Sequence, residues 1–315
     1  MARFLTVRIS LIAVTLLAVS VAIFLLIELV PGDAAQVMLG QQATPESLRG
    51  LREQMGLDRP PHIRYLDWIW NAVQGDLGVS AKSPDISIST VVGGRLANSA
   101  LLAIGAFIIA VPSALAAGVW VGTRVDTKVD RFLTMGSLIT ISLPEFVTGV
   151  IMILVLSSTL GWLPSSSIMM PGESILGNPQ VLIMPILTVT GALFAYIFRM
   201  ARANVIEVMG SNYVRTAILK GLPMRTVVVR HVLRNAMLPT ITVIANNVGW
   251  MFGGLIIIEN LFAYPGMGSL LIQAINTRDI RMLQSAAMVI AAVYAFSNLA
   301  ADLAYGALNP RVRLA

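Results

Sequence analysis

Six stretches of the sequence are each long and apolar enough to cross a lipid bilayer. A membrane-spanning helix needs about 20 mostly apolar residues. Only 12% of the 315 residues are charged, whereas soluble domains carry about 25%. The sequence therefore predicts an all-α membrane protein with six transmembrane helices. The predicted spans are Ile9–Leu29, Ser99–Val121, Phe132–Ser158, Val181–Ala203, Thr240–Leu261 and Gln284–Gly306.

Basic residues predict the orientation of these spans. Cytoplasmic loops of membrane proteins carry an excess of Lys and Arg. Most of the 22 basic residues fall in the two termini and in the second and fourth connecting loops, so both termini are expected in the cytoplasm. The first span is longer than the apolar core of a signal peptide and is expected to be retained as an anchor. The net charge of +6 is then an orientation signal, and no nucleic acid partner is expected.

The spans divide the chain into four segments. Residues 1–30 hold the N-terminal cytoplasmic tail and the first transmembrane helix, and residues 31–98 form an extracytoplasmic insertion. Residues 99–306 form a core of five transmembrane helices, and residues 307–315 form a cytoplasmic C-terminal tail.

The extracytoplasmic insertion is expected to be helical rather than a simple linker. Thr44-Pro45-Glu46 has the hydroxyl cap and early proline of a helix start, and a second helix is expected after Pro61. The second helix carries Tyr65, Trp68 and Trp70. Amphipathic rings of this kind are favoured at the boundary between water and lipid, so we expect this helix to lie there.

The longest cytoplasmic loop, residues 204–238, carries a short amphipathic helix. Val214, Ala217, Ile218 and Gly221 recur at the spacing of one helical face. A helix this short is marginally stable alone, so it is expected to lie in a groove. The small residues Ala217 and Gly221 would let another surface approach closely. The pattern leaves open whether that surface is a partner protein or the inner leaflet.

The same loop resembles the EAA loop of ATP-binding-cassette (ABC) importer permeases. The residues that match the general pattern are Ala217, Gly221 and Leu233. Four residues depart from the general pattern: Arg215, Thr216, His231 and Arg234. At these positions the loop resembles that of the first permease subunit of dipeptide, oligopeptide and nickel importers. Further motifs of that branch are Leu29-Val30-Pro31-Gly32-Asp33, Gly75-Asp76-Leu77-Gly78, Leu160-Gly161-Trp162-Leu163-Pro164, Pro265-Gly266-Met267-Gly268, Arg278-Asp279 and Asn309-Pro310.

This resemblance implies a type I ABC importer permease fold and a multi-pass position in a bacterial cytoplasmic (inner) membrane. The chain would form half of a translocation pore for di- or oligopeptides, with nickel chelates, glutathione or glycosides as alternative cargo. The implied partners are a second homologous permease subunit, two ABC ATPase subunits, an extracytoplasmic substrate-binding protein and membrane lipid. The residues implied in ATPase coupling are Tyr213, Val214, Arg215, Ala217, Ile218, Lys220, Gly221 and Leu222.

Several kinds of chemistry are disfavoured by the residues that the sequence lacks. It has no cysteine, and none of its three lysines follows the glycine-rich run of a phosphate-binding loop. Only two histidines occur, so neither a catalytic site nor a metal site is expected in this chain. ATP and Mg²⁺ are expected on the partner ATPase subunits. A secondary transporter remains an alternative, although the inverted repeats of that class are not evident.

Polar residues within the predicted spans are candidates for the translocation path. A polar group in the bilayer core normally faces a partner or water. The candidates are Glu145, Asn246, Asn247 and Asn298. Each side chain could instead form a structural hydrogen bond with a neighbouring helix. Gly118-x-x-x-Gly122 and Gly249-x-x-x-Gly253 permit close helix contact, either with a second permease or within the chain.

Overall fold

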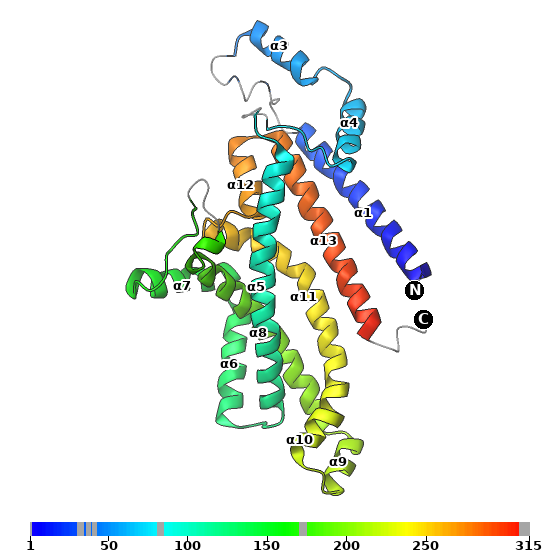
Figure 1. Ribbon diagram of the computed structural model, residues 1–315, viewed down its shortest axis with the longest axis vertical. Coiled ribbons are helices and arrows are strands. Elements are labelled where there is room, and N and C mark those ends of the chain that lie inside the picture. The colour runs from blue at the N-terminus through cyan, green and yellow to red at the C-terminus, as the bar shows by residue number, and fades with distance from the viewer. Residues whose placement is uncertain are drawn as a thin grey trace. The chain divides into compact units, whose positions relative to one another are not determined.

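A computed structural model describes residues 2–29, 35, 39, 43–80, 85–169 and 175–308 of the chain. Its elements are helices (Figure 1). The α-helices are α1 (Ala2–Leu29), α3 (Pro45–Met55), α4 (Pro61–Val73), α5 (Ile88–Gly122), α6 (Lys128–Ser142), α7 (Glu145–Met152), α8 (Gln180–Met209), α9 (Asn212–Leu219), α10 (Met224–Thr226), α11 (Leu233–Leu261), α12 (Met267–Thr277) and α13 (Ile280–Leu308). Two π-helical segments, η2 (Ile153–Thr159) and η4 (Val227–Val232), follow α7 and α10, and a short 3₁₀ helix, η3, covers Ile175–Gly177. Of the predicted motifs, Val30-Pro31-Gly32-Asp33 and Asn309-Pro310 lie outside the described residues.

The prediction of an all-helical membrane protein is confirmed. Among the described residues, five helices are long and apolar enough to span a bilayer, and the number becomes six if one bent pair counts as a span. The fifth predicted span lies within a longer helical run, because α10 and η4 lead into α11 without a break. Its predicted start at Thr240 is therefore too late.

The bent pair corrects the third predicted span, Phe132–Ser158, which is not one continuous helix. Helix α6 and the segment formed by α7 and η2 meet at an angle of 107°. Leu143 has an extended backbone, with φ −92° and ψ 135°. The ring of Pro144 disfavours a helical conformation at the residue before it, so α6 ends at Ser142 and a new helix begins at Glu145. By contrast, Pro112 and Pro185 lie inside continuous helices.

The chain forms two compact units, and α5 and α13 each contribute to both. The first unit contains Met1–Ser99 and Pro265–Phe296, and the second contains Ala100–Tyr264 and Ser297–Ala315. In the second unit, α8 buries half of its residues and packs against α6, α7 and α11. Its main core is built from apolar residues that include Leu102, Leu193, Leu255, Phe262 and Tyr264.

In the first unit, the end of the insertion packs against α12 and the start of α13. The Ser80 hydroxyl donates a hydrogen bond of 2.5 Å to a carboxylate oxygen of the buried Asp279. The backbone N–H of Met267 donates one of 2.8 Å to the Ser99 hydroxyl. Motifs that are far apart in the sequence are therefore neighbours in space.

The glycines of the first small-residue motif pack inside the chain. A methyl group added at Gly118 would lie 2.7 Å from the Ala201 Cβ and 2.9 Å from the Phe198 carbonyl oxygen, and one at Gly122 would lie 2.8 Å from a Val205 methyl carbon. Of the two alternatives for this motif, the structure therefore supports internal packing of α5 against α8.

We expect Gly118→Ala to lower the stability of the folded chain. Overpacking of a tight contact costs about 1–3 kcal/mol, because α5 and α8 must move apart to admit the methyl group. Gly94→Ala is the matched control, since no described atom lies within 4 Å of a methyl group at that position of α5. Both variants gain the same helix propensity. Thermal unfolding in detergent should show a lower midpoint for Gly118→Ala alone, and equal midpoints would contradict this packing.

Candidate coupling and translocation sites

The predicted amphipathic helix of the cytoplasmic loop is present as α9, eight residues long. It ends at Leu219 because Gly221 adopts a left-handed backbone conformation, with φ +75°. The N–H of Leu222 then donates a hydrogen bond to the Ala217 carbonyl, which closes the end of the helix. No described atom lies within 4 Å of a Cβ at Gly221. The structure therefore explains this glycine by its backbone conformation rather than by a close approach.

Two residues of the apolar stripe of α9, Val214 and Ala217, are covered by the chain itself, whereas Ile218 is exposed. Val214 and Ala217 are buried, and they form a cluster with Val205 from α8, Val227 from η4 and Ala236 from α11. The expected groove for this short helix is therefore supplied within the same subunit. This differs from the expectation that the stripe would face a neighbouring surface, and it gives both side chains a structural role.

The opposite face of α9 is exposed. Leu219 is the most exposed apolar side chain of this helix, with 79% of its surface accessible. Met224 follows in α10 and is also exposed. The predicted coupling residues that are exposed are Tyr213, Arg215, Ile218, Lys220, Gly221 and Leu222. Leu219 and Met224 were not among the predicted site residues, because Leu219 lies outside the periodic stripe and Met224 lies beyond the proline that ends it.

Helix α9 is also tied to α11 by a side-chain hydrogen bond. The Asn235 amide donates to the Tyr213 hydroxyl at 3.0 Å and to the His231 carbonyl oxygen at 3.2 Å. Together with the buried cluster, this bond fixes α9 to the helical run that contains α11. In Figure 1, α9 and α10 lie at the end of α8 where α11 begins.

Glu145 begins α7 at the break of the third predicted span. Its carboxylate lies against Gly254 of α11, in the space that a side chain at position 254 would occupy. Within the described residues, no ion pair joins this carboxylate to a basic side chain. Glu145 is therefore an acidic group packed on a predicted membrane helix without an ion-pair partner in the described part of the chain.

The depth of Glu145 follows from helix lengths. Helix α6 has 15 residues, which correspond to about 22 Å of a hydrocarbon core that is about 30 Å thick. In α8, Arg202 pairs with Asp130 at the start of α6, whereas Thr188 lies beside Gly149 of α7. Those two levels of α8 are about 21 Å apart along the helix axis. Both measures place Glu145 about 20 Å from the start of α6 along the helix axes, inside the predicted span Phe132–Ser158.

The three predicted asparagines lie on two helices. Asn298 of α13 is adjacent to Gly249 of α11, where a side chain would displace its amide. The Asn247 amide donates a hydrogen bond of 2.7 Å to the Val243 carbonyl oxygen in its own helix. Asn246 is exposed. The structure thus brings Glu145 and Asn298 to α11, at two levels of the same helix.

An ion pair between α6 and α8 was missed in the sequence analysis. The Arg202 guanidinium donates to both carboxylate oxygens of Asp130, at 2.6 and 2.8 Å. Asp130 is buried and also accepts from the Thr134 hydroxyl and the Asp126 backbone N–H. The sequence offered two signals for this pair. Arg202 lies within the predicted span Val181–Ala203, and Asp130 lies just before the predicted span Phe132–Ser158.

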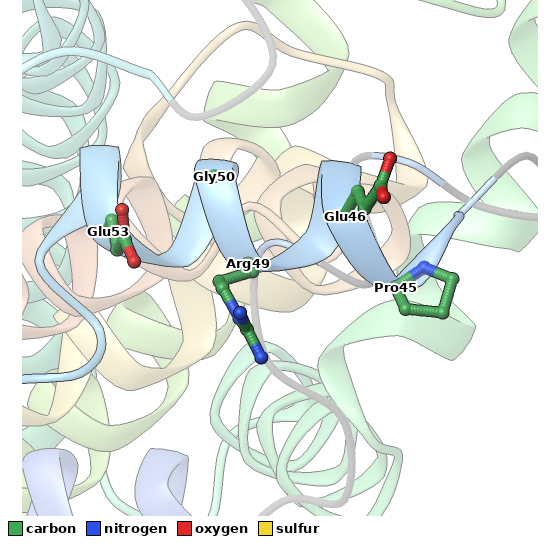
Figure 2. A pocket seen from close by; sticks show the side chains of 5 residues that line it. All are labelled: Pro45, Glu46, Arg49, Gly50 and Glu53. Carbon is green, nitrogen blue, oxygen red and sulfur yellow. The ribbon is translucent and has the colours of Figure 1, made fainter.

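The described residues also form a pocket on the extracytoplasmic helix α3. Figure 2 shows its lining, which comes from a single face of that helix and consists of Pro45, Glu46, Arg49, Gly50 and Glu53. It lies within the first unit, whereas the residues predicted for coupling and translocation belong to the second. In the same described part of the chain, no three His, Asp or Glu side chains are grouped as metal ligands.

Comparison with known proteins identifies the family. Residues 114–314 match the family described as binding-protein-dependent transport system inner membrane component, and residues 1–87 match its N-terminal family. The chain belongs to this permease family. A protein of Brucella suis biovar 1 named as a candidate peptide permease is 36% identical over 303 residues, which cover 95% of each chain. The glutathione transport system permease protein GsiC of Escherichia coli is 34% identical over 299 residues, again with 95% of each chain covered.

The resemblance on which the sequence analysis relied is thereby confirmed, together with the fold class. Membership makes this permease an inner membrane component of an ABC importer. Such a subunit transports rather than catalyses, and the apolar helices of the structure agree with that position.

Proposed function

We propose that this permease forms half of the translocation pore of an importer for di- or oligopeptides. The names of two similar proteins, one a candidate peptide permease and the other a glutathione permease, support cargo with peptide bonds. Glutathione is itself a small peptide derivative, so it is the second candidate cargo. Both termini would lie in the cytoplasm, because most basic residues gather at the termini and in two loops.

The exposed face of α9 is the observation that carries the coupling mechanism. Each ABC ATPase subunit would bind ATP and Mg²⁺, and one of them would contact Leu219 and its exposed neighbours. Helix α9 packs on α8, η4 and α11 through buried side chains. A movement of the ATPase would therefore be transmitted to these helices rather than absorbed by a flexible loop. Val214 and Ala217 would serve by holding α9 in place.

The translocation path would run along α11. Glu145 and Asn298 both contact this helix, and Asn246 and Asn247 lie on it. A second homologous permease subunit would supply the other half of the path. Cargo would arrive from an extracytoplasmic binding protein. A movement of α9 that is transmitted to α11 would change whether these polar groups are open to the cytoplasmic or the extracytoplasmic side of the membrane.

Reconstitution of the complete importer tests this proposal. The chain would be expressed with its partner ATPases, a second permease and a binding protein, and the complex would be assembled in proteoliposomes. We expect uptake of a tripeptide to require ATP, binding protein and both ATPases. Uptake that is driven by an ion gradient in the absence of the ATPases would overturn the proposal and support a secondary transporter.

A further inference from the structure

Helix α4 has three distinct faces, and one of them is apolar and exposed. Ile63, Leu66, Trp70 and Val73 recur along this helix at the spacing of one face. Their exposed fractions are 40%, 61%, 68% and 78%, respectively. A second face carries polar residues such as Asn71, which is also exposed. An exposed apolar face of this regularity indicates a surface that is covered in the assembled protein.

The third face of α4 packs against α1. The Tyr65 ring contacts Phe24 edge to face, with ring centroids 5.4 Å apart. The Tyr65 hydroxyl shares a hydrogen bond of 2.8 Å with the hydroxyl of Ser20, which is fully buried. Tyr65 therefore faces α1, whereas Trp70 lies on the exposed apolar face.

The position of this contact along α1 fixes its depth. The apolar span in α1 covers Leu5–Leu29. Ser20 lies nine residues before the end of that span, about 13 Å along the helix axis. The Arg64 guanidinium donates a hydrogen bond of 2.5 Å to the carboxylate of Glu28, near the end of the same span. Helix α4 therefore lies beside the last third of a membrane-spanning helix.

We propose that the exposed apolar face of α4 lies in the lipid of the outer leaflet. A surface beside a transmembrane helix at this depth is surrounded by acyl chains unless protein covers it. The arrangement of one apolar face, one polar face and a Trp near the end suits a helix in the bilayer interface. The assignment to the outer leaflet rests on the orientation in the proposed function. The contact between α1 and α4 would then hold the extracytoplasmic insertion at a fixed height relative to the membrane.

Single cysteine variants test this inference, because the chain has no native cysteine. Leu66→Cys and Trp70→Cys report on the apolar face, and Asn71→Cys is the matched control on the polar face. Each variant would carry a nitroxide label in the assembled importer, in nanodiscs of phosphatidylcholine and phosphatidylglycerol, with the other subunits free of reactive cysteine. Accessibility to oxygen, which concentrates in lipid, would be compared with accessibility to a water-soluble nickel chelate.

We expect the labels at positions 66 and 70 to be relaxed mainly by oxygen and the label at position 71 mainly by the nickel chelate. Relaxation by the chelate at positions 66 and 70 would overturn the proposal, because that face would be in water. Protection from both reagents would also overturn it, because a protein partner would cover the face. ATP-dependent uptake is measured separately with the same variants in proteoliposomes, so a failure of the transport proposal would be recognised independently of this result.

Discussion

Leu219→Asp is expected to abolish ATP-driven uptake while the permease still folds and inserts. The side chain is 79% exposed, so an aspartate there meets water in the isolated subunit and costs little stability. In the proposed complex, the same position lies against an ATPase. A central apolar contact in an interface contributes about 2 kcal/mol or more, and its loss would weaken subunit binding by about 30-fold.

The measurement for Leu219→Asp is co-purification of the ATPase with the permease, together with uptake in proteoliposomes. Leu219→Met is the matched control, because it keeps an apolar side chain of similar volume, and we expect it to retain both activities. Normal ATPase binding and uptake by Leu219→Asp would show that the exposed face of α9 is not the coupling surface.

A charge on the opposite face of α9 should have a different effect. Val214 is fully buried in the cluster that α8, η4 and α11 share with α9. An aspartate there would have to be desolvated without a partner, at a cost of several kcal/mol. We therefore expect Val214→Asp to reduce the amount of folded permease in the membrane, whereas Leu219→Asp leaves that amount unchanged.

This contrast shows how far periodicity alone could predict the coupling element. The spacing of Val214, Ala217 and Ile218 correctly predicts a helix and its apolar stripe. It does not state which molecule covers that stripe. In this protein the covering residues come from α8, η4 and α11, which are separated from α9 by turns that no local pattern describes. The exposed residues of α9 are then Ile218 and those outside the stripe, Leu219 above all.

Hydropathy predicted which stretches of the chain are membrane-spanning, but it did not predict where a helix breaks within such a stretch. The window over Phe132–Ser158 is apolar on average, so its hydropathy gives no sign of a 107° bend. The local signal was Pro144, whose effect on Leu143 is a backbone restriction rather than a change in hydropathy. The ion pair of Asp130 and Arg202 was equally hidden, because each residue sits at a span boundary where charge is common. Tertiary packing, not composition, decides that they meet.

Gly254→Ala is expected to impair transport, because it would displace the carboxylate of Glu145. That carboxylate occupies the space of a side chain at position 254. The displacement costs about 1–3 kcal/mol if the surroundings resist it, which would lower the rate of peptide uptake by about tenfold if Glu145 lines the path. Gly253→Ala is the matched control, since no described atom lies within 4 Å of a methyl group there.

The two alanine variants differ only in what the new methyl group meets. Each replaces a glycine in the same turn of α11 and gains about 1 kcal/mol of helix propensity, so neither should lose expression through the helix itself. Glu145→Gln keeps the shape of the side chain and removes its charge, and we expect it to reproduce the transport defect of Gly254→Ala without a loss of stability. Uptake at the normal rate in Glu145→Gln, with a defect in Gly254→Ala, would assign the contact to helix packing. Normal uptake in both would remove Glu145 from the translocation path, because neither its charge nor its position would then matter to the cargo.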